Sequence, residues 1–231
     1  EATIEGFYKK YSHAPLSLQD GIPLACKGVD YGVSGNEAAV STARGRAYGV
    51  EFMFRWFGSG KFNLLTSYTY FRSQFIQPST GKYLPSAWDN RHLLTLSGTY
   101  KLPKNWDIGL KLRVMGGAPF TPYDENLSSI VSAWDATVRP YYDYGLYNTG
   151  RLKTFSQIRL DKSFYFKGVM LGIYIDLQNI GNFKYDSQPV LVSTGVVDPQ
   201  IYPDGNQHYK MKYIRQQSGT ILPTLGLTVE F

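Results

Sequence analysis

The stretch Trp106-Asp107-Ile108-Gly109-Leu110-Lys111-Leu112-Arg113-Val114 decides the fold. Apolar side chains stand at every second position, and Asp, Gly, Lys and Arg fill the positions between them. Successive side chains of a β-strand point to opposite faces. The stretch therefore predicts a strand with one wholly apolar face and one polar, charged face, and its period of two does not suit a helix.

The same alternation recurs along most of the chain and predicts eight strands in an all-β protein. No run of about 18 apolar residues exists, which excludes a transmembrane helix, but a spanning strand needs only about 9–11 residues. We also expect no helix of any length. Besides Trp106–Val114, the predicted strands are Ala2–Tyr11, Tyr48–Trp56, Lys61–Phe75, Arg91–Leu102, Phe155–Phe166, Val169–Asn179 and Ile221–Phe231.

The connections between these strands alternate in length. Short turns at one end and long loops at the other are typical of outer-membrane barrels, in which the short turns face the periplasm. This pattern predicts that the C-terminal Phe231 lies on the periplasmic side. The short turns are Gly58-Ser59-Gly60, Pro103-Lys104-Asn105 and Lys167-Gly168, and the long segments are His13–Gly45, Gln77–Asn90, Gly116–Arg151 and Gly181–Gly219.

A soluble β-sandwich or a lipocalin-like barrel also alternates, so periodicity alone does not settle the class. The predicted strands are longer than the usual 5–6 residues of globular sheets. Aromatic residues such as Trp56, Phe62 and Trp106 stand beside the short turns, as in an interfacial girdle. We therefore expect a transmembrane β-barrel wall whose polar face, with Glu51 and Arg55, lines a lumen.

Charge and cysteine content argue against several functions. The net charge is +6, but Lys and Arg are scattered singly, so we expect no nucleic-acid partner. The single Cys26 cannot form an internal disulfide and is expected to be a passive loop residue. The three histidines lie far apart in sequence, and we expect no metal site and no cofactor.

One junction resembles the parts of a catalytic site. Ser86, Asp89 and His92, with Arg91, lie close together at a predicted rim. An outer-membrane enzyme would need a nucleophile and a base that converge there. We favour a junction role for these residues and predict no catalytic residue.

The long loops offer better candidates for ligand contact, because their tyrosines combine an apolar ring with a polar hydroxyl. The alternative is that these side chains only pack the loops together. The candidates are Tyr123, Tyr141, Tyr142 and Tyr144 in one loop, and Tyr202, His208 and Tyr209 in another.

Several segments together resemble TonB-dependent outer-membrane receptors of the SusC-like, carboxypeptidase-regulatory-like type found in Bacteroidetes. Arg46–Glu51 is similar to a strand opening of that family, and Ser86–His92 resembles its loop-to-strand junction. Gly117–Pro122 and Tyr174–Asn182 resemble later segments, and Leu225–Phe231 is similar to its C-terminal signature.

The resemblance implies that residues 1–231 are the C-terminal part of a 22-stranded barrel whose N-terminal plug lies outside this chain. It implies active import of a scarce nutrient across a bacterial outer membrane. The implied partners are the remaining strands and plug, the TonB energising complex, a SusD-like surface lipoprotein, and membrane lipid or lipopolysaccharide. The alternatives are a self-contained eight-stranded barrel with a structural or adhesive role and, less favoured, an outer-membrane enzyme.

Overall fold

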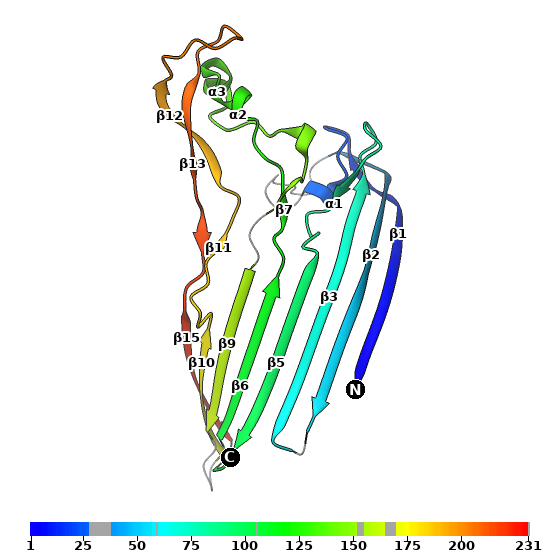
Figure 1. Ribbon diagram of the computed structural model, residues 1–231, viewed down its shortest axis with the longest axis vertical. Coiled ribbons are helices and arrows are strands. Elements are labelled where there is room, and N and C mark those ends of the chain that lie inside the picture. The colour runs from blue at the N-terminus through cyan, green and yellow to red at the C-terminus, as the bar shows by residue number, and fades with distance from the viewer. Residues whose placement is uncertain (28–37, 59, 105, 152–154, 165–169, 231) are drawn as a thin grey trace.

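A curved antiparallel sheet of long strands forms most of the molecule, and long loops rise above one end of it (Figure 1). The computed structural model describes residues 1–27, 38–58, 60–104, 106–151, 155–164 and 170–230. Several features expected from the sequence lie outside these residues: Ser59, Asn105, the Lys167-Gly168 turn with its flanking strand ends Phe166 and Val169, and Phe231.

The main sheet is a meander in which each long strand pairs with the next long strand along the chain, in the order β1-β2-β3-β5-β6-β9-β10-β15. Within the described residues β1 pairs only with β2 and β15 only with β10, so the sheet is open. A short strand, β4 (Tyr83–Pro85), adds to β3. The long strands are β1 (Ala2–Ser17), β2 (Ala39–Phe57), β3 (Phe62–Ile76), β5 (His92–Leu102), β6 (Trp106–Met115), β9 (Phe155–Phe164), β10 (Met170–Gln178) and β15 (Leu222–Glu230).

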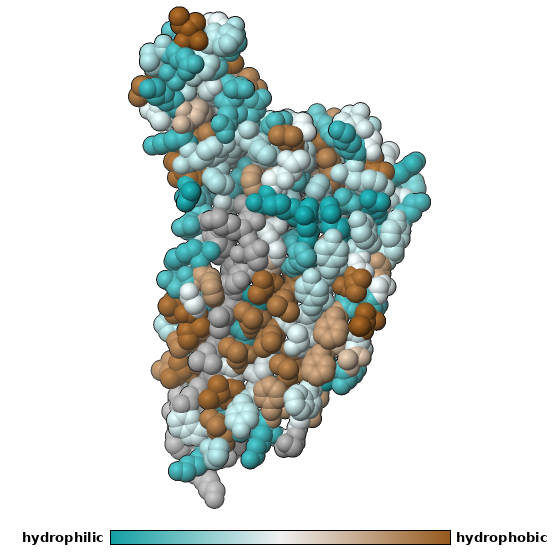
Figure 2. Space-filling model, in the orientation of Figure 1, coloured by the Kyte–Doolittle hydropathy of each residue, from teal (hydrophilic) through white to brown (hydrophobic). Residues whose placement is uncertain are grey.

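The register places the expected apolar positions on one face of the sheet. Val50 of β2 lies opposite Tyr70 of β3. Tyr68, which is two residues from Tyr70 in β3, lies opposite Leu94 of β5. Leu94 in turn lies opposite Val114 of β6. Partners in a ladder share a face, so the apolar faces of these strands are continuous. Figure 2 shows hydrophobic residues gathered over the lower half of the sheet, with a hydrophilic band above them.

This apolar face is uncovered. Side chains such as Ile4, Trp56 and Leu225 are 77%, 52% and 74% exposed. A soluble sandwich would bury such a face against a second sheet, whereas a membrane barrel turns it toward lipid. The buried residues gather instead beneath the loops, where Ile22, Cys26, Phe75, Leu84 and Tyr147 form one cluster. The expected fold class, an antiparallel transmembrane barrel wall, is confirmed.

The first hairpin is longer than the sequence predicts. The expected strand Ala2–Tyr11 continues to Ser17, and β2 begins at Ala39 inside the expected loop His13–Gly45. The ladder shifts register after Tyr11, where His13 takes a positive φ of 59°. This bulge, together with small residues of little polar contrast, hides the continuing strand from a periodicity argument.

The expectation of no helix was wrong. The loops carry α1 (Leu24–Lys27), α2 (Glu125–Ser129), α3 (Val131–Thr137) and the 3₁₀ turn η2 (Tyr144–Leu146). The longest has seven residues, which is too short for a clear period of 3.6. Among the described residues, no helix is long and apolar enough to cross a membrane.

The long loops also contain short strands. The segment expected as the loop Gly181–Gly219 forms a hairpin of β12 (Val190–Val197) and β13 (Tyr209–Ile214), which rises well above the sheet (Figure 1). Two further pairs brace the loop bases: β7 (Pro119–Phe120) with β8 (Gly150–Arg151), and β11 (Tyr185–Asp186) with β14 (Gln217–Ser218).

Candidate functional site in the long loops

The two loops that carry the candidate ligand residues pack against each other. Their backbones meet where Val131 N donates to Gln207 O over 2.9 Å. At the side chains, Tyr213 Oη donates to Glu125 Oε1 over 2.6 Å. Burial and this bond raise the pKa of Tyr213 to about 12, so the phenol stays a donor at neutral pH. The loops therefore form one joined structure.

His208 is the centre of this junction. Its ring is only 3% exposed, stacks on Tyr202 with centroids 3.9 Å apart, and shares hydrogen bonds with Ser129 Oγ (2.7 Å) and Asp204 Oδ2 (3.0 Å). Hydrogen bonds from Asn206, then the contact with His208, lower the pKa of Asp204. These contacts pack His208 between the two loops.

Two other candidate tyrosines make hydrogen bonds within and between the loops. Tyr209 Oη donates to Asp135 of α3 over 3.3 Å, which adds a further link between the loops. Tyr141 Oη donates to Ala133 O over 3.1 Å, and its backbone N–H donates to Ser128 Oγ over 2.8 Å. Within the described part of the chain, no three His, Cys, Asp or Glu side chains gather as a metal site would require.

The remaining candidates form a row of aromatic rings. Tyr123 stacks on Tyr142 at 4.9 Å between centroids, Tyr142 contacts Tyr144 at 6.4 Å, and Tyr144 stacks on Tyr147 at 6.2 Å. Tyr147, at one end of the row, is buried, and its neighbour Tyr144 is 54% exposed. The row is thus fixed in the loop core at Tyr147 and meets solvent at Tyr144.

A cavity of about 380 Å³ opens beside Tyr142 and Tyr144 of this row. Arg139 stands among the tyrosines as the only charged lining residue, and no ion pair or hydrogen bond engages its guanidinium within the described residues. A guanidinium beside phenol rings suits a ligand with both a ring or apolar face and an anionic or polar group. The lining residues are Ala136, Thr137, Arg139, Pro140, Tyr141, Tyr142 and Tyr144.

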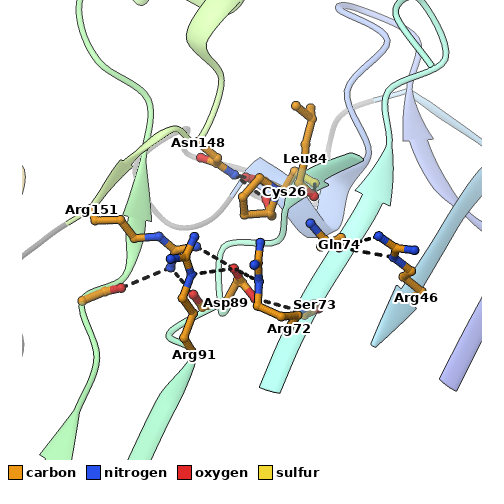
Figure 3. Close-up of polar contacts among 12 residues, drawn as sticks. Cys26, Arg46, Arg72, Ser73, Gln74, Leu84, Asp89, Arg91, Asn148 and Arg151 are labelled. Carbon is orange, nitrogen blue, oxygen red and sulfur yellow. Dashed lines mark hydrogen bonds and ion pairs between the residues drawn. The ribbon is translucent and has the colours of Figure 1, made fainter. Parts of the chain in front are cut away.

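A buried carboxylate holds the bases of the loops to the barrel wall (Figure 3). Asp89 is fully buried, and its Oδ2 lies 2.5 Å from Arg151 Nη2, 3.3 Å from Arg72 Nε and 3.9 Å from Arg91 Nε. Its Oδ1 accepts the backbone N–H of Ser73 over 2.7 Å. One side chain thereby joins β3, β8 and the start of β5.

Asn148 makes a second tie above Asp89. Its amide Nδ2 donates to Cys26 O over 2.7 Å and to Pro85 O over 2.8 Å, so three loops meet at one side chain. Burial raises the pKa of the Cys26 thiol to about 12. Cys26 is therefore an unreactive packing residue, in line with the passive role expected for it.

The residues that suggested a catalytic site point to different partners. The Asp89 carboxylate forms ion pairs with arginines. His92 Nδ1 shares a hydrogen bond of 2.9 Å with Tyr68 Oη. The His92 ring also packs against Tyr70 with centroids 5.2 Å apart. Ser86 Oγ is buried and has no hydrogen-bond partner within the described residues. These residues form a structural junction.

An open antiparallel sheet with an uncovered apolar face, short turns at one end and long loops at the other is similar in fold to part of the barrel of a TonB-dependent outer-membrane receptor. Two solved structures show this arrangement. The ferripyoverdine receptor of the outer membrane of Pseudomonas aeruginosa, bound to ferripyoverdine, superposes with a TM-score of 0.54 at 13% identity, over 80% of this chain and 21% of that one. The FpvAI-pyocin S2 complex gives 0.54 at 14% identity, over 80% and 22%.

These two comparisons support the fold and not a specific ligand, because both identities are low. The chain spans about a fifth of the length of the solved structures that it matches. No protein-family model matches the sequence, and no curated protein matches it.

Proposed function

We propose that this chain supplies barrel wall and extracellular loops to a TonB-dependent active importer of a scarce nutrient. The observation that carries the proposal is the likeness of its sheet to part of a receptor barrel. The open edges β1 and β15 support it, because unpaired backbone groups in lipid cost several kcal/mol each. Further strands, with a plug inside them, would satisfy these edges, whereas a self-contained eight-stranded barrel would need β1 to pair with β15.

The cavity beside Arg139 is the proposed ligand contact of this part of the importer. Tyr142 and Tyr144 would hold the flat or apolar part of the nutrient, and Arg139 would hold its anionic or polar group. His208, Tyr202 and Tyr209 would keep the loops in place without touching the nutrient.

The SusC-like subtype would add a surface lipoprotein that caps the loops. The tip of the β12–β13 hairpin supports this, since Ile201 is 92% exposed and Val196 is 56% exposed at the part of the molecule farthest from the sheet (Figure 1). Exposed apolar side chains that are grouped at a loop tip suit a protein contact.

The first test is the denatured mass of the polypeptide that carries this chain in outer membranes, detected with an antibody against residues 198–206. We expect a mass several-fold above 26.1 kDa. A mass near 26 kDa with no larger companion would overturn the importer proposal. Access of the antibody to intact cells tests whether the long loops face outward.

The second test compares nutrients left in spent medium by the wild-type strain, a deletion strain, and a strain with Arg139→Gln and Tyr144→Ala. The importer proposal predicts that one nutrient class stays behind in the deletion strain and in the double variant. Trp88→Ala is the matched control, because Trp88 is 65% exposed in another loop and does not line the cavity. Equal depletion by all strains would contradict the proposal.

A further inference from the structure

Val138, at the end of α3, holds a strained backbone conformation. Its φ of 52° and ψ of 29° lie in the left-handed region. Seven non-glycine residues take a positive φ in the described part of the chain, and Val138 is the only one with a β-branched side chain. Contact between Cβ and the backbone disfavours this region for L-residues by a factor of about 5–30. The side chain of Val138 is 71% exposed, so no packing compensates for the strain.

Hydrogen bonds on both sides of Val138 hold this turn. The backbone N–H of Val138 donates to Trp134 O over 2.6 Å and closes the end of α3. Thr137 Oγ1 donates to Arg139 O over 3.0 Å and lies 3.3 Å from the backbone N of Arg139, whose N–H it accepts. Pro140 follows, and a residue before proline is restricted to extended conformations. The chain therefore passes from helix to extended backbone within one residue.

The residues on both sides of Val138 line the cavity of the proposed function. Thr137 and Arg139 belong to its lining, and the Arg139 guanidinium makes no ion pair or hydrogen bond with a described residue. Strained backbone that is held in place by its surroundings is concentrated at ligand sites and switches. If Val138 relaxed to the right-handed or extended region, the chain after it would leave in another direction. That change would carry Arg139 away from the tyrosines of the cavity.

We propose that Val138 is a strained hinge that presents Arg139 to the anionic group of the nutrient. This inference rests on the proposed function, because it takes the cavity as the nutrient contact. A bound anion stabilises the state in which Arg139 is presented, and the strain at Val138 opposes that state. The apparent affinity is then the intrinsic affinity multiplied by the fraction of molecules that present Arg139. The strained hinge therefore lowers the affinity of the site and lets the nutrient leave it more readily than a relaxed hinge would.

The test compares substitutions that differ in their preference for the left-handed region, in the full-length polypeptide that carries this chain. Val138→Gly and Val138→Asn relax the hinge, because glycine adopts this region freely and asparagine tolerates it. Val138→Ile is the matched control, since it keeps the β-branch and with it the strain. Thr137→Val removes the hydroxyl that holds the turn at nearly constant shape, and Thr137→Ser restores it.

Two readouts follow the hinge and the cavity separately. The first is hydrogen exchange at the backbone amides of residues 138 and 139, corrected for the intrinsic rate of each sequence, and it needs no ligand. The second is calorimetric titration with 4-hydroxybenzoate, a water-soluble probe with a flat ring and one carboxylate. The companion probe is 4-hydroxybenzamide, which has the same ring and no charge.

We expect Val138→Gly to slow exchange at these amides about 5- to 30-fold, Val138→Asn to slow it less, and Val138→Ile to match the wild type. Thr137→Val should speed exchange about fivefold, the worth of one hydrogen bond, and Thr137→Ser should not. Binding of 4-hydroxybenzoate should tighten and weaken in the same order, whereas binding of 4-hydroxybenzamide should not follow it.

Equal exchange in all Val138 variants, or exchange ordered by side-chain size, would overturn the proposal. It would also be overturned if exchange followed the expected order but 4-hydroxybenzoate did not bind in that order, because the hinge would then not serve the cavity. Nutrient depletion is measured separately, so either failure leaves the importer proposal standing.

Discussion

Replacing Asp89 by asparagine tests whether one buried carboxylate fixes the loop bases to the wall. The change keeps the shape of the side chain and removes its charge. Three guanidinium groups, those of Arg72, Arg91 and Arg151, would then face one another without their shared anion. The amide of the new side chain would still offer an oxygen to the N–H of Ser73, so the main loss is electrostatic.

The size of the effect follows from burial. Removing one partner of a buried ion pair costs about 3–5 kcal/mol. The arginine side chains here are 22–42% exposed and can turn partly toward water, so we expect about 2–4 kcal/mol. Since each 1.4 kcal/mol is a factor of ten, the local opening equilibrium around Asp89 should rise roughly 30- to 1,000-fold.

The assay is hydrogen exchange by mass spectrometry on the full-length polypeptide, read on peptides that cover Ser73 and the segments 84–90 and 148–151. Exchange there should speed up by the factor above, while the short-turn end of the sheet stays protected. Glu51→Gln is the control, because Glu51 is exposed and has no ion pair among the described residues. Exchange within about threefold of the wild type in Asp89→Asn would refute the assigned role.

Three further changes test other parts of the structure. Gly49→Ala should lower the folded, heat-modifiable fraction of the protein on a gel, because a Cβ at this position would overlap the carbonyl oxygen of Tyr70. An unchanged folded fraction would contradict the β2–β3 register. Cys26, with its pKa raised to about 12, should react with a maleimide at pH 8 about a thousandfold more slowly than in the unfolded chain, and labelling within minutes would disprove its burial. The raised pKa of Tyr213 means that its bond to Glu125 contributes fully below pH 10 and is lost between about 10 and 12, so Tyr213→Phe should remove the latest phase of the ultraviolet phenolate titration.

The sheet was predictable where the side chains alternate sharply in polarity. Trp106–Val114 matches β6 to within one residue, and its apolar positions lie on the face expected for them. The prediction failed at Ala39–Ala47 because this part of β2 opens with small residues that give little contrast between the two faces. A periodicity argument detects a strand only where its two faces differ in polarity.

The sequence indicated which loops carry the candidate residues, but it did not indicate which side chains contact one another. The long loops and their tyrosines were visible in the sequence, and Tyr141, Tyr142 and Tyr144 do lie beside a cavity. The roles of the others depend on partners far along the chain. Ser129 and His208 are 79 residues apart, and Asp89 and Arg151 are 62 apart. No local sequence pattern indicates such pairs. Arg139, however, stands close to several loop tyrosines in the sequence, and this arrangement could have indicated a ligand contact.

The meander order of the sheet sets the sequence of events during assembly. Each long strand needs only its neighbour along the chain, so the wall can grow one hairpin at a time. The entropy lost on closing a loop rises with its length, and joining β10 to β15 across residues 179–221 costs about 2 kcal/mol more than closing the tight turn between β2 and β3. The two pairs with long connections, β6 with β9 and β10 with β15, should therefore be the slowest to register.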